Sequence, residues 1–119
     1  MVRRYPIEEL IWASGATGAA LTKTITKFMH GRCEQIEVEL NDNTGNRTLT
    51  LTVLSALGGT LYTKATIPVN ANTVYNANKA TADFDAWLAD EEVTITLVLS
   101  GDPSTSTGIA SVAFLMSDN

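Results

Sequence analysis

Strict alternation of apolar and polar residues restricts what this chain can fold into more than any other feature of its sequence. Three stretches show it most clearly: EQIEVEL (34–40), RTLTLTVLS (47–55) and VTITLVLS (93–100). Successive side chains of a β-strand point to opposite faces, so this alternation gives a strand with one apolar face. The sequence therefore predicts a chain built largely of half-buried strands.

Turn-forming residues separate these stretches. NDNTGN (41–46) lies between the first two stretches and predicts a β-hairpin. Gly58–Gly59 marks a second turn, TLYTKATI (60–67) reads as the next strand, and Pro68 is expected to end it. The stretch LTKTITKFMHGR (21–32) is expected to run almost unbroken into residues 34–40, with Gly31 as a bulge or bend.

These patterns predict an all-β fold. We expect residues 1–119 to form a single antiparallel β-sandwich or jelly roll of about seven strands, with the strand order left open. The 17 threonines, mostly at every second position, favour the same class.

Three segments do not follow the alternation. Residues 1–6 are a candidate extended N-terminal arm, and NANTVYNANKATA (70–82) is expected to be a long loop. In DFDAWLA (83–89) the apolar residues follow helical spacing. We expect at most one short helical turn there, or an aromatic plug over the core.

Charge disfavours two classes of partner. The net charge is −5 and the pI is near 4.6, whereas proteins bind nucleic-acid phosphates mainly through clusters of Lys and Arg. The one basic cluster, Arg3–Arg4, is closely followed by Glu8–Glu9. We therefore expect no nucleic-acid partner and no binding to anionic membranes. The sequence shows no apolar run of about 18 residues and no signal peptide, which predicts synthesis in a cytoplasm.

The residues that usually carry chemistry are few. A single cysteine, Cys33, excludes an intrachain disulfide, and a single histidine, His30, stands three positions before it. A Cys–His pair is a conceivable nucleophile and base, but residues three apart on a strand point to opposite faces. One histidine and one cysteine cannot build a zinc site, and the carboxylates of residues 83–92 are more typical of solvated charge than of a calcium site. The sequence predicts a non-enzyme without metal or cofactor.

Three segments are candidates for contact with a partner: the closing strand, the N-terminal arm and the long loop at 70–82, since long loops are often functional. The closing stretch GIASVAFLM (108–116) is apolar on both faces, so we assign Val112, Phe114 and Met116 to a candidate subunit interface. The alternative is that this strand is central and buried under Phe84 and Trp87. In the N-terminal arm, Arg3, Arg4 and Tyr5 are candidate contact residues, unless the arm is disordered.

The order of segments resembles that of small structural proteins from tailed-phage virions, in particular β-sandwich or jelly-roll capsid decoration (cement) proteins. The resemblance runs over residues 20–119, from TKTITKFMHGRCEQIEVELND through RTLTLTVLSALGGTLYT and WLADEEVTITLVLSGD to TGIASVAFLM. Strand faces of Thr and Ser that are poor in Lys suit a protein that assembles into close-packed oligomers, because the edge strands of monomeric proteins are usually protected by charge.

The resemblance implies a protein on the outer surface of the virion capsid, bound to the major capsid protein, that reinforces the shell. It also implies a homo-oligomer, with a trimer favoured, and it carries over no catalytic residues. Two alternatives remain open. One is a tail or baseplate component. The other is a carbohydrate-binding or receptor-binding module that would use exposed aromatic rings, with Trp12, Tyr62, Tyr75 and Trp87 available.

Overall fold

The computed structural model describes residues 2–42, 45–69, 71–77, 83–104 and 107–118, and it confirms the all-β fold. The strands are β1 (Val2–Pro6), β2 (Leu10–Trp12), β3 (Thr22–Leu40), β4 (Leu49–Leu54), β5 (Thr60–Ile67), β6 (Ala71–Asn76), β7 (Leu88–Leu99) and β8 (Gly108–Ser117). A short 3-10 helix, η1 (Gly18–Leu21), connects β2 to β3.

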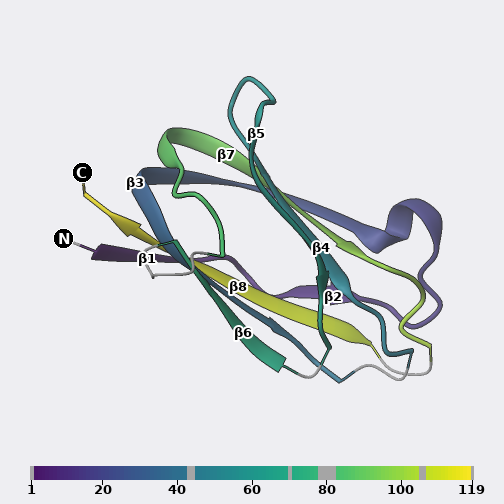
Figure 1. The fold of residues 1–119 in the computed structure, drawn as a ribbon. Helices are drawn as coiled ribbons and strands as arrows, with labels where there is room; N and C mark the ends of the chain where they lie inside the picture. Colours follow the sequence, from purple (N-terminus) through teal and green to yellow (C-terminus); the bar gives the residue numbers. More distant parts are fainter. Residues whose placement is uncertain (1, 43–44, 70, 78–82, 105–106, 119) are drawn as a thin grey trace.

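The strands form one antiparallel sheet that bends back on itself into two layers (Figure 1). Its hydrogen-bonded path is β1-β8-β3-β7-β4-β5, with β2 also beside β8 and β6 also beside β3. One layer holds β5, β4, β7 and the first half of β3, and we call it the β7 layer. The other holds β1, β2, β8, β6 and the second half of β3, and we call it the β8 layer.

The long strand β3 belongs to both layers because it bends at Gly31. Residues Thr22–Arg32 pair with β7, and residues Arg32–Leu40 pair with β8. Gly31 has φ +119°, and a Cβ at this position would lie 2.3 Å from the Ser117 carbonyl oxygen. Only glycine fits such a conformation and such a close approach. The predicted near-continuous strand with a bend at Gly31 is confirmed.

The core lies between the two layers, where the predicted alternation places the apolar residues. In β7 the inward residues Val93, Ile95, Leu97 and Leu99 are fully buried, while the threonines between them are partly exposed. The equivalent inward positions of β3, β4 and β8 pack against them. Burial of these side chains from water is the main driving force for this arrangement.

The segment 70–82, predicted to be a loop, contains a strand instead. Residues Ala71–Asn76 form β6, which pairs with Gln35–Leu40 of β3 without a register shift. Asn and Ala have low β propensity, and pairing with β3 overrides that preference. Residues 70 and 78–82 of the predicted loop lie outside the described residues.

Residues 83–89 contain no helical turn. Bends and irregular backbone lead directly into β7 at Leu88, and the helical turn of the described chain is η1 (Gly18–Leu21), between β2 and β3. The alternative expectation of an aromatic plug is confirmed. The Trp87 ring is buried, and the Phe84 ring packs edge-on against Tyr62 at a centroid distance of 5.0 Å.

The N-terminal segment lies along β8. In β1 the register runs from Val2 opposite Ser117 to Pro6 opposite Ala113, and β2 continues along the same edge of β8. A hydrogen bond from the Ile7 N–H to the Val112 carbonyl joins the two pairings. The described part of the candidate arm is therefore extended and forms an edge strand of the β8 layer.

Candidate functional site

The outward face of the β7 layer is covered with threonine side chains. Thr24 of β3 pairs with Thr96 of β7, which pairs with Thr52 of β4, which in turn pairs with Thr63 of β5. These four threonines form a row across four strands, and the hydroxyls of Thr52 and Thr63 are 3.2 Å apart. The TxT repeats of the sequence generate this face, because the apolar residues between them point into the core.

The threonine face, defined as the outward Thr side chains of β3, β4, β5 and β7, carries no charge, and the exposed Phe28 and Glu92 follow it on the same side of the sheet towards the bend of β3. Each threonine side chain offers a methyl group and a hydroxyl that both donates and accepts hydrogen bonds. A partner can cover such a surface without removing a charge from water, which would cost far more than covering a hydroxyl. The threonine face is thus suited to a protein contact.

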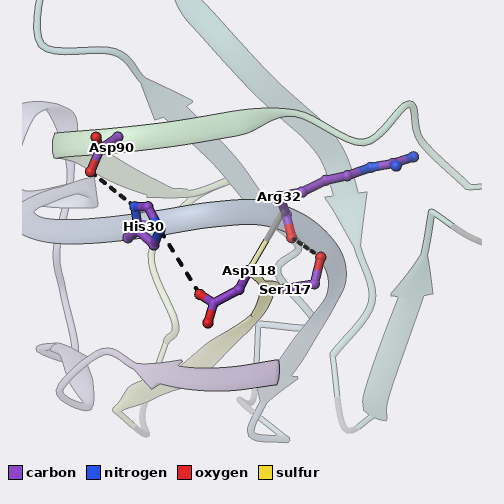
Figure 2. Close-up of polar contacts among 5 residues, drawn as sticks. All are labelled: His30, Arg32, Asp90, Ser117 and Asp118. Atoms are coloured by element: carbon purple, nitrogen blue, oxygen red, sulfur yellow. Dashed lines mark hydrogen bonds and ion pairs between the residues drawn. The ribbon is translucent and has the colours of Figure 1, made fainter. Parts of the chain in front are cut away.

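A group of polar side chains lies at one end of this face, near the bend of β3 (Figure 2). The His30 Nδ1 is 3.0 Å from Asp90 Oδ1, and the His30 Nε2 is 3.9 Å from Asp118 Oδ1. All three side chains are well exposed to solvent. Figure 2 shows the Arg32 side chain pointing away from His30. In this setting the two carboxylates hold one solvent-exposed ring, and His30 and Asp90 border an open hollow of about 340 Å³ that Leu88 and Ala89 also line.

His30 and Cys33 do not form a catalytic pair. The Cys33 thiol is fully buried, with Sγ 3.8 Å from the Gln35 carbonyl oxygen, whereas the His30 ring lies on the outer surface. Burial raises the pKa of Cys33 to about 12, which keeps the thiol protonated and a poor nucleophile. The structure confirms that these residues occupy opposite faces of β3.

Of the three predicted contact residues in the N-terminal segment, only Arg4 lies at a cleft, which has a volume of about 440 Å³ on the outer face of the β8 layer. Arg4 lines this cleft and its guanidinium is 2.9 Å from the Glu37 carboxylate. The hydrogen bond from Arg4 lowers the pKa of Glu37 and raises the pKa of Arg4. Arg3 is exposed, and Tyr5 is half-buried against the core.

The three residues assigned to a subunit interface lie inside the chain. Val112, Phe114 and Met116 are 3%, 0% and 1% exposed, and the Phe114 ring packs edge-on against Trp87 with centroids 6.1 Å apart. This is the alternative in which the closing strand is central and covered by Trp87. The second apolar face of β8 is the opposite one, formed by Ile109, Ala113 and Leu115.

The aromatic rings considered for carbohydrate stacking are not available to a ligand. Trp12, Tyr62, Tyr75 and Trp87 are all between 0% and 8% exposed. Stacking on a sugar needs an open ring face, so the structure gives no support to the carbohydrate-binding alternative.

The described residues contain no group of three or more His, Cys, Asp or Glu side chains placed to hold a metal ion. Within the same part of the chain, no helix has the length and hydropathy needed to cross a membrane.

Sequence reasoning missed two features of these surfaces. The His30–Asp90–Asp118 group joins three distant parts of the chain, and only the β3–β7 register brings its first two members together. The β6 strand was missed because its three strand-favouring residues, Thr73, Val74 and Tyr75, are flanked by Asn and Ala, which are depleted in strands. A search for a strand able to pair with the free side of residues 35–40 would have found it.

Comparison with known proteins gives matches to solved structures alone. No protein-family model matches the chain, and no curated protein matches it. One similar structure is the infectious bursal disease virus VP2 subviral particle, with 15% identity and a TM-score of 0.44 over 99% of this chain. A structure of the infectious bursal disease virus Gx strain has 14% identity and a TM-score of 0.46, also over 99% of this chain.

A third structure, of T=1 particles derived from the same virus, has 15% identity and a TM-score of 0.40 over 97% of this chain. The matches cover 33%, 32% and 32% of those chains, so this chain spans about a third of the length of each. Identities and TM-scores this low do not establish a family for the chain.

Proposed function

We propose that this chain is a structural protein of a virus particle, specifically a decoration protein that binds the outer surface of a tailed-phage capsid and stabilises the shell. Two observations support the proposal. The order of its strand segments resembles that of phage decoration proteins, and its fold presents a broad uncharged face suited to a close-packed contact.

The threonine face carries the proposal. The row Thr24–Thr96–Thr52–Thr63 joins four strands without a charge. A partner that covers this row therefore removes hydroxyls and not charges from water, and burying charges would cost far more. In the proposed complex this face lies against the major capsid protein, and its hydroxyls hydrogen-bond to the shell.

The N-terminal strand supplies a second proposed contact. Arg3 is exposed, while Arg4 is held by Glu37 at the cleft on the β8 layer. We assign Arg3, Arg4 and Tyr5 to recognition of the capsid at the rim of this layer. Arg3 is the member of the three best placed to meet an acidic group, because no ion pair holds it among the described residues.

Rebinding to capsids tests the proposal. Heads of the virus that encodes this chain are stripped of it, incubated with purified protein and assayed for bound copies and for resistance to heat. We expect rebinding by the wild-type chain and its loss in the double variant Thr52→Lys, Thr96→Lys, which places two charges on the threonine face. Thr17→Lys, on the exposed link before η1, is the matched control and should rebind.

Each outcome has a defined meaning. Failure of the wild-type chain to rebind, or rebinding without a gain in heat resistance, contradicts the decoration role. Equal rebinding by both variants shows that the contact lies elsewhere than on the threonine face. The number of copies in each native virion separates a shell protein from a tail or baseplate component, because shell sites far outnumber tail sites.

A further inference from the structure

The free edges of the two layers differ in how they are protected. A sheet edge exposes unpaired backbone N–H and C=O groups that can pair with another strand, and proteins block this with charges, prolines or bulges. Among the described strands, β1, β2, β5, β6 and the first half of β3 have such an edge, and β2 is only three residues long, which itself limits pairing. Of the four longer edges, only one lacks all of these protections.

Three of the edges are blocked. In β1, Arg3 and Arg4 carry charge, Pro6 has no N–H and its carbonyl oxygen already accepts a hydrogen bond from Lys27 Nζ at 2.8 Å. The first half of β3 carries Lys23 and Lys27. Strand β5 carries Lys64, its pairing with β4 has two register shifts, and Thr66 has φ +59°.

Strand β6 has none of these features. Its sequence ANTVYN contains no charged residue and no proline, and its register with β3 is unbroken. The Val74 side chain is 41% exposed on the outward face. A flat, uncharged edge of this kind is a template for strand addition.

The hydrogen bonds at the end of β6 show which of its backbone groups face the free edge. The Asn76 N–H donates to Asp83 Oδ2 at 2.8 Å, and the Asn76 carbonyl accepts from the Asp83 N–H at 2.9 Å. Asn76 therefore points away from β3. Because neighbouring residues of an antiparallel strand alternate between its two sides, Asn72 and Val74 also point away from β3, and Thr73 and Tyr75 bond to it.

We propose that β6 pairs with β6 of a second copy of this chain, in an antiparallel two-fold contact that joins two β8 layers into one sheet. Asn72 and Val74 each offer one N–H and one C=O. The register with Asn72 opposite Val74 of the other copy uses all of these groups, and Thr73 lies beside its own equivalent at the centre. Asp83 caps the strand at Asn76, which limits the pairing to this short segment.

The charges on the edge strands favour pairing of β6 with β6 of a second copy over pairing between two β1 strands. Pairing β1 with itself would bring Arg3 and Arg4 towards the same arginines, which is unfavourable, whereas β6 meets β6 without any charge. The contact is two-fold, so it predicts dimers in place of the trimers that the family resemblance implies. It does not depend on the proposed function.

Two measurements test the contact. Sedimentation of the purified chain from micromolar to millimolar concentration should show a monomer–dimer equilibrium. Over the same range, amide hydrogen exchange by NMR should become slower at Asn72 and Val74. The amides of Thr73 and Tyr75 are internal controls, because they bond to β3 in the monomer and should be protected throughout.

Charge variants identify the register. The double variant Asn72→Lys, Val74→Lys places like charges opposite each other in both hydrogen-bonded pairs and should weaken dimerisation by about tenfold or more. The matched variant Asn72→Glu, Val74→Glu, measured on its own, should also dimerise more weakly. A mixture of the two should form a heterodimer, because opposite charges then face each other, and this recovery is not expected from a folding defect.

Thr63→Lys on the threonine face is the control for added charge and should dimerise like the wild type. Three results would overturn the proposal. They are a wild-type chain that stays monomeric at all concentrations, a trimer, or a dimer that tolerates both double variants. A wild-type chain that dimerises but does not rebind to stripped capsids would refute the proposed function and leave this contact standing.

Discussion

The bend of β3 and the alternation of side chains along it determine whether a residue near the bend is buried or exposed. Cys33 follows the bend by two residues and is fully buried, whereas His30 precedes it and is exposed. The two reactive side chains thus lie on opposite faces of β3. Their chemistry depends on burial more than on their closeness in the sequence.

Cys33 is expected to be unreactive in the folded chain. Its pKa is raised to about 12 by burial, so almost no thiolate forms at mildly alkaline pH. Iodoacetamide should leave the native protein unlabelled and should label it fully in guanidinium chloride, as followed by intact mass. Rapid labelling without denaturant would show that the core opens around Cys33.

The raised pKa of Cys33 also makes the free energy of unfolding depend on pH. The folded thiol holds its proton to a higher pH than the unfolded thiol, so its contribution is complete below the unfolded pKa and is lost as pH rises towards about 12. Urea unfolding of the wild type against Cys33→Val should show the wild type losing stability relative to the variant above about pH 9. A constant difference over this range would contradict the assignment.

The Arg4–Glu37 pair gives the opposite pH dependence of stability. Arg4 lowers the pKa of Glu37, so the pair stabilises the fold above the unfolded pKa of a glutamate, and this contribution is lost as pH falls through the lower folded value. In Arg4→Gln, NMR titration of the Glu37 side-chain carbon should give a higher pKa than in the wild type. An unchanged pKa would mean that the pair does not form in solution.

At the scale of elements, β3 determines the architecture because one strand serves both layers. The sequence predicts this from the apolar alternation on each side of Gly31, and it also predicts β4, β5 and β7, whose patterns are regular. It does not predict β6, because Asn and Ala carry no strand signal and the pairing with β3 decides the conformation.

The candidate site could be predicted only in part. The TxT repeats are enough to predict an uncharged outward face, because alternation places their hydroxyls together on one side of each strand. For β8, which is apolar on both faces, alternation alone does not show which face turns inward. The structure turns Val112, Phe114 and Met116 to the core because Trp87, far away in sequence, covers that side.

Gly31 and Gly58 form a matched pair for testing the bend. Both have positive φ, +119° and +91°, but a Cβ at Gly31 would meet the Ser117 carbonyl, whereas a Cβ at Gly58 would have nothing within 4 Å. Gly58→Ala should cost about 1–2 kcal/mol from its backbone conformation alone. Gly31→Ala should cost about 2–5 kcal/mol because the clash adds to this cost.

Denaturant unfolding of both variants measures the difference. Equal losses of stability would show that the backbone at Gly31 moves freely enough to relieve the clash, and that the bend is not held by the contact with β8.

At the scale of the whole molecule, a single core fills the space between the two layers, and β8 supplies one of its sides. Phe114 is fully buried in this core and packs on Trp87. Its residue type alone cannot distinguish a core from a subunit interface. The concentration dependence of unfolding can.

Phe114→Ala should lower the free energy of unfolding by about 3–5 kcal/mol. Because the side chain is buried within one chain, this loss should be the same at every protein concentration, as measured by circular dichroism during urea unfolding. A variant that stays fully folded but dissociates on dilution would place Phe114 at an interface after all.

The pairing of β1 with β8 has a mechanical consequence. Val2 lies opposite Ser117, so the two ends of the described chain leave from the same end of one strand pair, as Figure 1 shows. Tension between residues 2 and 117 would load the hydrogen bonds of this pair one after another, as in a zip, and not all together. The fold should therefore begin to open at this strand pair, and at low force, when it is pulled by its ends.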